Sequence, residues 1–153
     1  MKTILRKQLK KVESHYEALF EYHSYIEAMG FDFSSEAFSS LSTEQKAVLE
    51  AYLKRFSSLQ DFLGAKVFKS LLDVSGVSYT RMSEVLTLIE KEEIIDLDTW
   101  IALRNIRNNL EHDYPDELDE ALLDLKDCIE YFTYMKEVVT KVIEFAERYN
   151  ETT

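Results

Sequence analysis

The sequence predicts an all-α protein, and its turn residues, its apolar periodicity and its helix caps support the same fold class. Its 153 residues include only three Gly and one Pro, too few for the frequent turns of a β protein. Apolar residues make up 46% of the chain, which lets a domain of this length bury a core. We therefore predict one domain over residues 1–153, an up-and-down bundle of about five helices.

Glycines and a serine-rich stretch divide the first half of the chain. The first helix is expected over about 2–29, because Gly30 is the residue type that most often follows a helix C-terminus. Residues 31–41, rich in Ser and Phe, are expected to form a loop with a short turn of helix. A shorter helix over about 81–91 should follow the turn at Gly76.

The second helix carries the clearest start signal in the sequence. Ser42 and Gln45 have the spacing of a capping box, in which each side chain bonds the backbone of the other residue. The helix should continue to about residue 73, with a bend near 57–58. Gly64 lies inside it, which indicates either a mild helix defect or a close contact with another helix.

Two further helices are expected in the second half. The fourth begins at Asp96 or Asp98, both suitable N-caps, and cannot continue past Tyr114 because Pro115 follows. The fifth begins near Asp116 and is expected to run on as one helix. Its apolar residues are spaced four, three, four and three apart, as one helix face requires: Leu118, Leu122, Leu125, Ile129 and Phe132.

Charge is unevenly distributed along the chain. The net charge of −11 argues against general affinity for nucleic acid, although it leaves room for a local site. Acidic residues are dense from Asp113 onward. Five cations, with no acidic residue among them, lie within the first eleven positions: Lys2, Arg6, Lys7, Lys10 and Lys11.

Cysteine usage and hydropathy indicate a cytoplasmic protein. The single Cys128 excludes an internal disulfide and a cysteine-based zinc site, which favours a reducing compartment. No apolar run reaches the length of a membrane span or of a signal peptide core, so no membrane association is expected. No glycine-rich phosphate loop is present, and we expect neither a cofactor nor a metal.

The strongest functional signal is an arginine followed five residues later by a histidine. Arg107 offers a permanent charge and a planar set of donors that fits phosphate oxygens. His112 can accept and return a proton near neutral pH. Together such groups can cleave RNA without a metal, because the histidine takes the 2′-hydroxyl proton and the arginine stabilises charge on the phosphate. Both are therefore candidate catalytic residues.

The helical pattern predicts two faces for this segment. Leu103, Ile106 and Leu110 should face the core, whereas the polar side chains should face elsewhere and carry little core packing. Arg107 and His112 are about 140° apart on a regular helix, so one helix does not aim both at one atom. Two arrangements would still bring the two side chains together. The backbone could relax in the last turn before Pro115, or a dimer could pair the histidine of one chain with the arginine of the other. A second polar row has four-residue spacing: Arg104, Asn108 and His112.

A structural interpretation of the same residues is also available. Polar faces near helix ends are usually solvated, and Arg107 with Glu111 would form a helical pair worth about 0.3 kcal/mol. His15 and His23, eight residues apart, are interpreted as ordinary helix residues and not as metal ligands. Aromatic side chains are expected in packing roles and Cys128 is expected to be buried; these aromatic residues are Trp100, Tyr131 and Tyr134.

The motif and its context resemble the HEPN superfamily, in particular the HepT-like toxins that pair with minimal nucleotidyltransferases. The likeness covers about residues 45–147. Upstream it includes an aromatic and leucine pattern over 56–72, Gly76, the segment 82–89 and the segment 94–100. Four residues match positions of the Arg-x4-His-x-Tyr signature: Arg107, Asn108, His112 and Tyr114.

The resemblance implies a dimeric endoribonuclease toxin, with Asn108 and Arg104 in supporting roles. Its antitoxin would be a minimal nucleotidyltransferase that transfers AMP to Tyr114, and this AMPylation would repel an RNA phosphate. Glu111 departs from the family, which usually has a small or aliphatic residue there. The alternative is a non-catalytic substrate-binding subunit of the same superfamily that serves as a partner of the nucleotidyltransferase.

Overall fold

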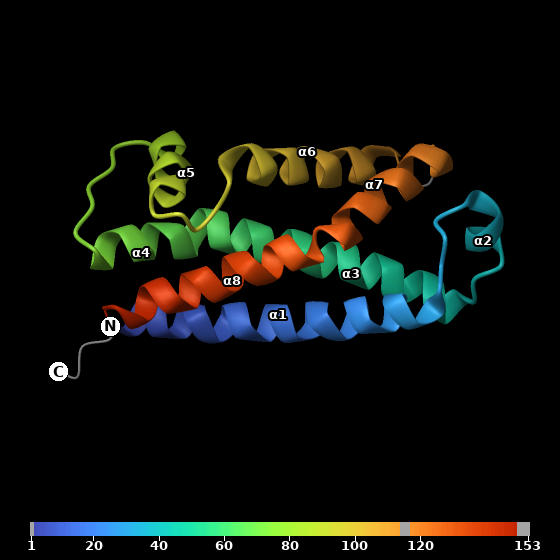
Figure 1. The fold of residues 1–153 in the computed structure, drawn as a ribbon, viewed down its shortest axis with the longest axis horizontal. Helices are drawn as coiled ribbons and strands as arrows, with labels where there is room; N and C mark the ends of the chain where they lie inside the picture. Colours follow the sequence, from blue (N-terminus) through green and yellow to red (C-terminus); the bar gives the residue numbers. More distant parts are fainter. Residues whose placement is uncertain (1, 114–116, 150–153) are drawn as a thin grey trace.

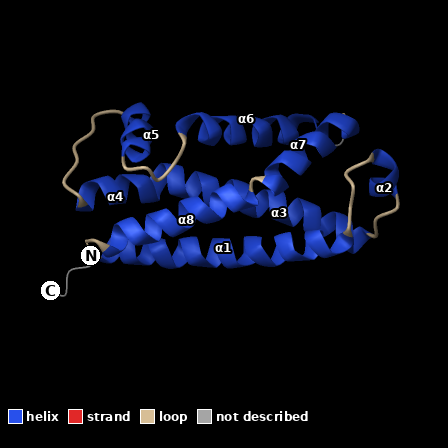
Figure 2. Ribbon diagram, in the orientation of Figure 1, coloured by secondary structure: helices blue, strands red, loops and turns tan. Residues whose placement is uncertain are grey.

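The computed structural model describes residues 2–113 and 117–149, and over these ranges every regular element is a helix, joined by loops and turns, with no strand (Figure 2). The all-α prediction is confirmed. The elements are α1 (Thr3–Met29), α2 (Ser35–Ser39), α3 (Thr43–Phe62), the π-helical turn η1 (Leu63–Val67), α4 (Phe68–Val74), α5 (Met82–Lys91), α6 (Leu97–Asp113), α7 (Leu118–Glu130) and α8 (Phe132–Glu147).

The helices form an elongated bundle (Figure 1). Helices α1, α3 and α8 follow its long axis, and α6 runs along the opposite side of α3. The most extensive contacts join α1 to α3 and α6 to α7, while α8 also packs on α1. Helix α5 and the beginning of α1 lie at one end of the bundle, and α2 lies at the other end.

The local end signals predicted from the sequence are present. Gly30 follows α1 with a φ of 64°, the left-handed conformation expected after a helix. The capping box is confirmed, with the Gln45 N–H donating to the Ser42 hydroxyl at 3.1 Å and the Ser42 N–H donating to the Gln45 side chain at 2.9 Å. Asp96 caps α6, since its carboxylate accepts the Thr99 N–H at 3.0 Å.

The second predicted helix is continuous, but its irregularity does not lie where the sequence predicted a bend. The backbone is α-helical through 57–58, where a bend was expected, and the irregularity is the π-helical turn η1 a few residues later. Gly64 lies in this turn beside Trp100. A Cβ added at Gly64 would lie 3.8 Å from the indole ring, an ordinary contact distance, so the packing of Trp100 does not require a glycine.

The last predicted helix is broken into α7 and α8 at Tyr131. The backbone there has φ −80° and ψ 9°, although no Gly or Pro interrupts the sequence. The apolar stripe continues from Ile129 to Phe132 across the break, which is why the sequence indicated one helix. Because α7 packs on α6 whereas α8 packs on α1, the change of direction lets both segments bury their apolar faces.

Six aromatic side chains are buried in the core of the described chain: Tyr52, Phe56, Phe68, Trp100, Phe132 and Phe145. Trp100 and Cys128 are buried as predicted, and burial raises the pKa of the Cys128 thiol to about 12. The buried Tyr52 hydroxyl donates to the Cys128 carbonyl at 2.9 Å and joins α3 to α7. Tyr134 is half-buried and bonds the Asp96 backbone, whereas Tyr131 is exposed.

The two histidines of α1 have packing roles. The Arg55 guanidinium on α3 donates to His15 Nδ1 at 3.0 Å, so this imidazole nitrogen carries no proton. The His23 ring stacks on Phe132 of α8 with ring centroids 4.1 Å apart. Burial lowers the pKa of both histidines, and the nearby cations Arg55 and Lys11 lower that of His15 further.

These depressed pKa values predict a loss of stability in mild acid. The unfolded chain takes up protons as the pH falls through about 6.5, while the folded histidines resist protonation, so the free energy of unfolding should decrease. His15→Gln keeps an acceptor for Arg55 and removes the titration. Urea unfolding at pH 8, 6.5 and 5 should show a smaller decrease for the variant than for the unmodified protein. An identical decrease would contradict the contribution of His15.

Candidate functional site

The motif residues lie on the second half of α6, whose two faces are only partly as predicted. Leu103 and Leu110 are buried and Ile106 is half-buried, as the apolar periodicity indicated. The polar row with four-residue spacing is exposed along its whole length: Arg104, Asn108 and His112. This part of α6 therefore presents a cation, an amide and an imidazole to solvent.

Arg107 does not face solvent, which corrects the sequence-based prediction. Only 6% of the residue is exposed. Its Nη1 donates to the Ser57 carbonyl at 2.9 Å and its Nη2 to Asp61 Oδ1 at 2.5 Å, both on α3. Its Nε is buried without a hydrogen-bond partner. The guanidinium thus joins α6 to α3, and the i,i+4 pair with Glu111 is not formed.

Asp61 is the site residue that sequence reasoning missed. It lies one helical turn after Ser57, so its carboxylate and the Ser57 carbonyl are held close together on α3. The Asp61 side chain is 65% exposed, and it meets Arg107 at the edge of the α3–α6 contact. Arg107 follows 46 residues later, and no local pattern predicts so distant a pair.

His112 lies in the last turn of α6 and is exposed. Arg107 turns inward to α3, so one copy of the chain does not bring the two predicted catalytic side chains together. Tyr114, the predicted modification site, and Pro115 lie outside the described residues. Glu111, immediately before His112, lines both an apolar cavity and an adjoining groove between α3 and α6.

Comparisons with protein families, with curated proteins and with solved structures found no match to this chain. None of the described helices is both long and apolar enough to cross a membrane.

Proposed function

We propose that this chain is a HEPN-like, metal-independent endoribonuclease, the toxin partner of a minimal nucleotidyltransferase. The observation that carries the proposal is the exposed row on the second half of α6: Arg104, Asn108 and His112. An imidazole with a cation and an amide on the same face can meet a phosphodiester without rearranging the core.

His112 would act as the general base. It takes the proton of a ribose 2′-hydroxyl, and the oxygen attacks the adjacent phosphorus. The bond from phosphorus to the 5′-oxygen breaks, and that oxygen leaves with a proton from solvent or from a second imidazolium. The products are a 2′,3′-cyclic phosphate and a 5′-hydroxyl end, and no metal is consumed or required.

The cation for this reaction is best supplied across a homodimer. Arg104 is eight residues from His112, about 12 Å along the helix axis, and Arg107 is turned toward α3. A two-fold axis beside α6 would place the exposed Arg104 of one copy near His112 of the other copy. Light scattering of the purified chain at micromolar concentration should give the mass of a dimer.

His112→Ala tests the proposed reaction. Without the base, we expect cleavage of single-stranded RNA to fall by a factor of about 10² to 10⁴. Because His112 is exposed, the free energy of unfolding should change by less than about 0.5 kcal/mol. Asn109→Ala, also exposed on α6 but outside the motif, is the matched control and should cleave normally. The rate of RNA cleavage should be the same with and without a metal chelator, because the proposed reaction requires no metal.

The predicted modification of Tyr114 gives a second test. With a minimal nucleotidyltransferase as the proposed partner, together with ATP and magnesium, the mass of one AMP should appear on the peptide that contains Tyr114. Cleavage should decrease in proportion, because the added phosphate repels RNA beside His112. Tyr114→Phe should still cleave and should escape inactivation. An active transferase that leaves the peptide unmodified would contradict this step.

One observation favours the alternative, a non-catalytic subunit that presents α6 to a nucleotidyltransferase. Arg107, the motif cation, is already paired with Asp61 and buried, as a structural residue would be. This function predicts binding to the transferase without any cleavage of RNA. Growth arrest on expression that disappears with His112→Ala would favour the nuclease.

A further inference from the structure

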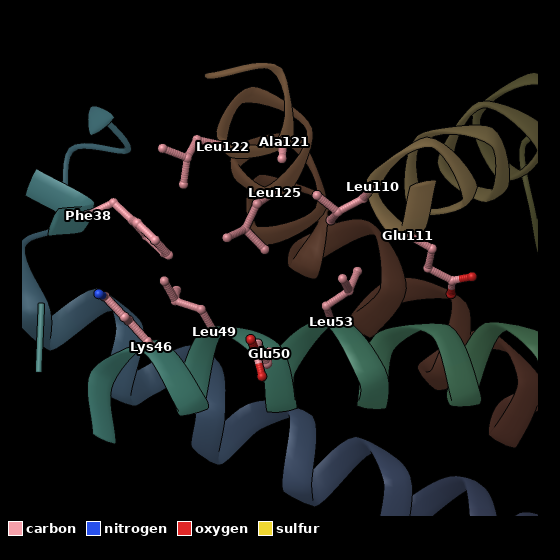
Figure 3. A pocket seen from close by; sticks show the side chains of 10 residues that line it. All are labelled: Phe38, Lys46, Leu49, Glu50, Leu53, Leu110, Glu111, Ala121, Leu122 and Leu125. Atoms are coloured by element: carbon pink, nitrogen blue, oxygen red, sulfur yellow. The ribbon is translucent and has the colours of Figure 1, made fainter. Parts of the chain in front are cut away.

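An apolar cavity opens at the end of the bundle where α2 lies. Its volume is about 120 Å³, and its walls come from α2, α3, α6 and α7 (Figure 3). Most of the lining is apolar: Phe38, Leu49, Leu53, Leu110, Leu122 and Leu125. Since a cavity of roughly 150 Å³ holds a benzene molecule, this one would hold a four- or five-carbon aliphatic group.

The mouth of this cavity is acidic. Glu50 and Glu111 line the cavity and also the adjoining groove between α3 and α6. Neither carboxylate belongs to an ion pair among the residues that the structure describes. Lys46, the cation of the cavity lining, lies over the Phe38 ring at 5.1 Å. The site would therefore accept an aliphatic group that is flanked by positive charge.

The opposite end of the same chain carries such a group. Ile4, in the first turn of α1, is 68% exposed, the highest exposure among the large apolar residues described. Lys7 follows at i+3 and therefore shares its helix face, whereas the Lys11 ammonium lies over the Phe62 ring of the same chain at 4.5 Å. The first turn of α1 has no side-chain cap and no acidic residue, so a carboxylate from elsewhere would also stabilise its positive dipole end.

We propose that the beginning of α1 of one copy docks into this cavity of a second copy. Ile4 fills the apolar space, and Lys7 pairs with Glu50 or Glu111 at the mouth. The two surfaces lie at opposite ends of the bundle, so the contact is head-to-tail. It therefore differs from the two-fold dimer proposed above, and it adds mass beyond that dimer, or beyond the monomer if that dimer does not form.

Two complementary variants of the full chain test this contact. The first, Ile4→Asp with Lys7→Glu, alters only the α1 surface. The second, Glu50→Lys with Glu111→Lys, alters only the cavity mouth. All four positions are exposed, so both variants should fold. In sedimentation experiments near 0.15 M salt and several hundred micromolar protein, the unmodified chain should associate further with concentration, and neither variant alone should do so.

Mixing the two variants gives the decisive result. The intact α1 of the second variant can still enter the intact cavity of the first, so one head-to-tail contact should return in the mixture. With the first variant isotope-labelled, backbone amide shifts should appear around Lys46, Leu49 and Leu122. Two control variants carry matched changes at exposed positions elsewhere, Met82→Asp and Glu17→Lys. Each control protein should associate like the unmodified chain.

Three outcomes would overturn the proposal: no association of the unmodified chain beyond the two-fold dimer, association that both variants retain, or a loss that mixing does not restore. The test does not depend on RNA cleavage. A failure here would leave the His112 experiment unaffected, and a failure of that experiment would leave this contact standing.

Discussion

Arg107→Ala is expected to destabilise the fold by about 2–3 kcal/mol, because it removes a buried side chain and its charged hydrogen bonds. The Ser57 carbonyl and Asp61 lose their guanidinium partner, and the contact between α3 and α6 loses packing. For a chain of this size the melting temperature should fall by about 5–10 °C. Arg104→Ala, on the exposed side of α6, should change it little.

Arg107→Met separates the structural from the chemical role of this arginine. Methionine keeps an unbranched side chain in the same space, and Asp61 is exposed enough to remain hydrated without a partner. The variant should recover most of the stability that alanine loses. If Arg107 also stabilises the phosphate during cleavage, Arg107→Met should fold and yet cleave poorly. Normal cleavage by the Met variant would assign Arg107 to structure alone.

Trp100→Ala should be the most damaging single substitution considered, with a cost of about 3–5 kcal/mol. The indole is 2% exposed and packs on Phe68 with ring centroids 5.2 Å apart. It also lies against η1 beside Gly64, so truncation opens a cavity between α6 and the α3–α4 segment. Since domains are stable by only about 5–15 kcal/mol, a large part of the stability would be lost.

Chemical denaturation with circular dichroism would measure this effect. Trp100→Phe retains an aromatic ring and should lose clearly less than Trp100→Ala. Leu123→Ala, at an exposed leucine of α7, is the surface control and should change the free energy of unfolding by less than about 0.5 kcal/mol. A Trp100→Ala protein as stable as this control would contradict the packing assigned to the indole.

The sequence by itself determined the fold class and most helix ends, because these depend on interactions within a few residues. Scarce Gly and Pro argue against an all-β fold, and apolar spacing indicates which side of each helix is buried. Gly30, the Ser42–Gln45 box and Asp96 mark helix ends through bonds that span three residues or fewer. The exposure of Arg104, Asn108 and His112 also follows from helical spacing alone.

Only the tertiary structure decided how these helices are broken and which polar side chain is buried. The break at Tyr131 exists because two different neighbours cover α7 and α8. The direction of Arg107 depends on Ser57 and Asp61, which are 50 and 46 residues away. Helical periodicity predicts that a charged side chain such as Arg107 faces solvent. Acceptors on another helix, here on α3, turn this side chain inward instead. Such a pair forms only when packing has already brought α3 and α6 together.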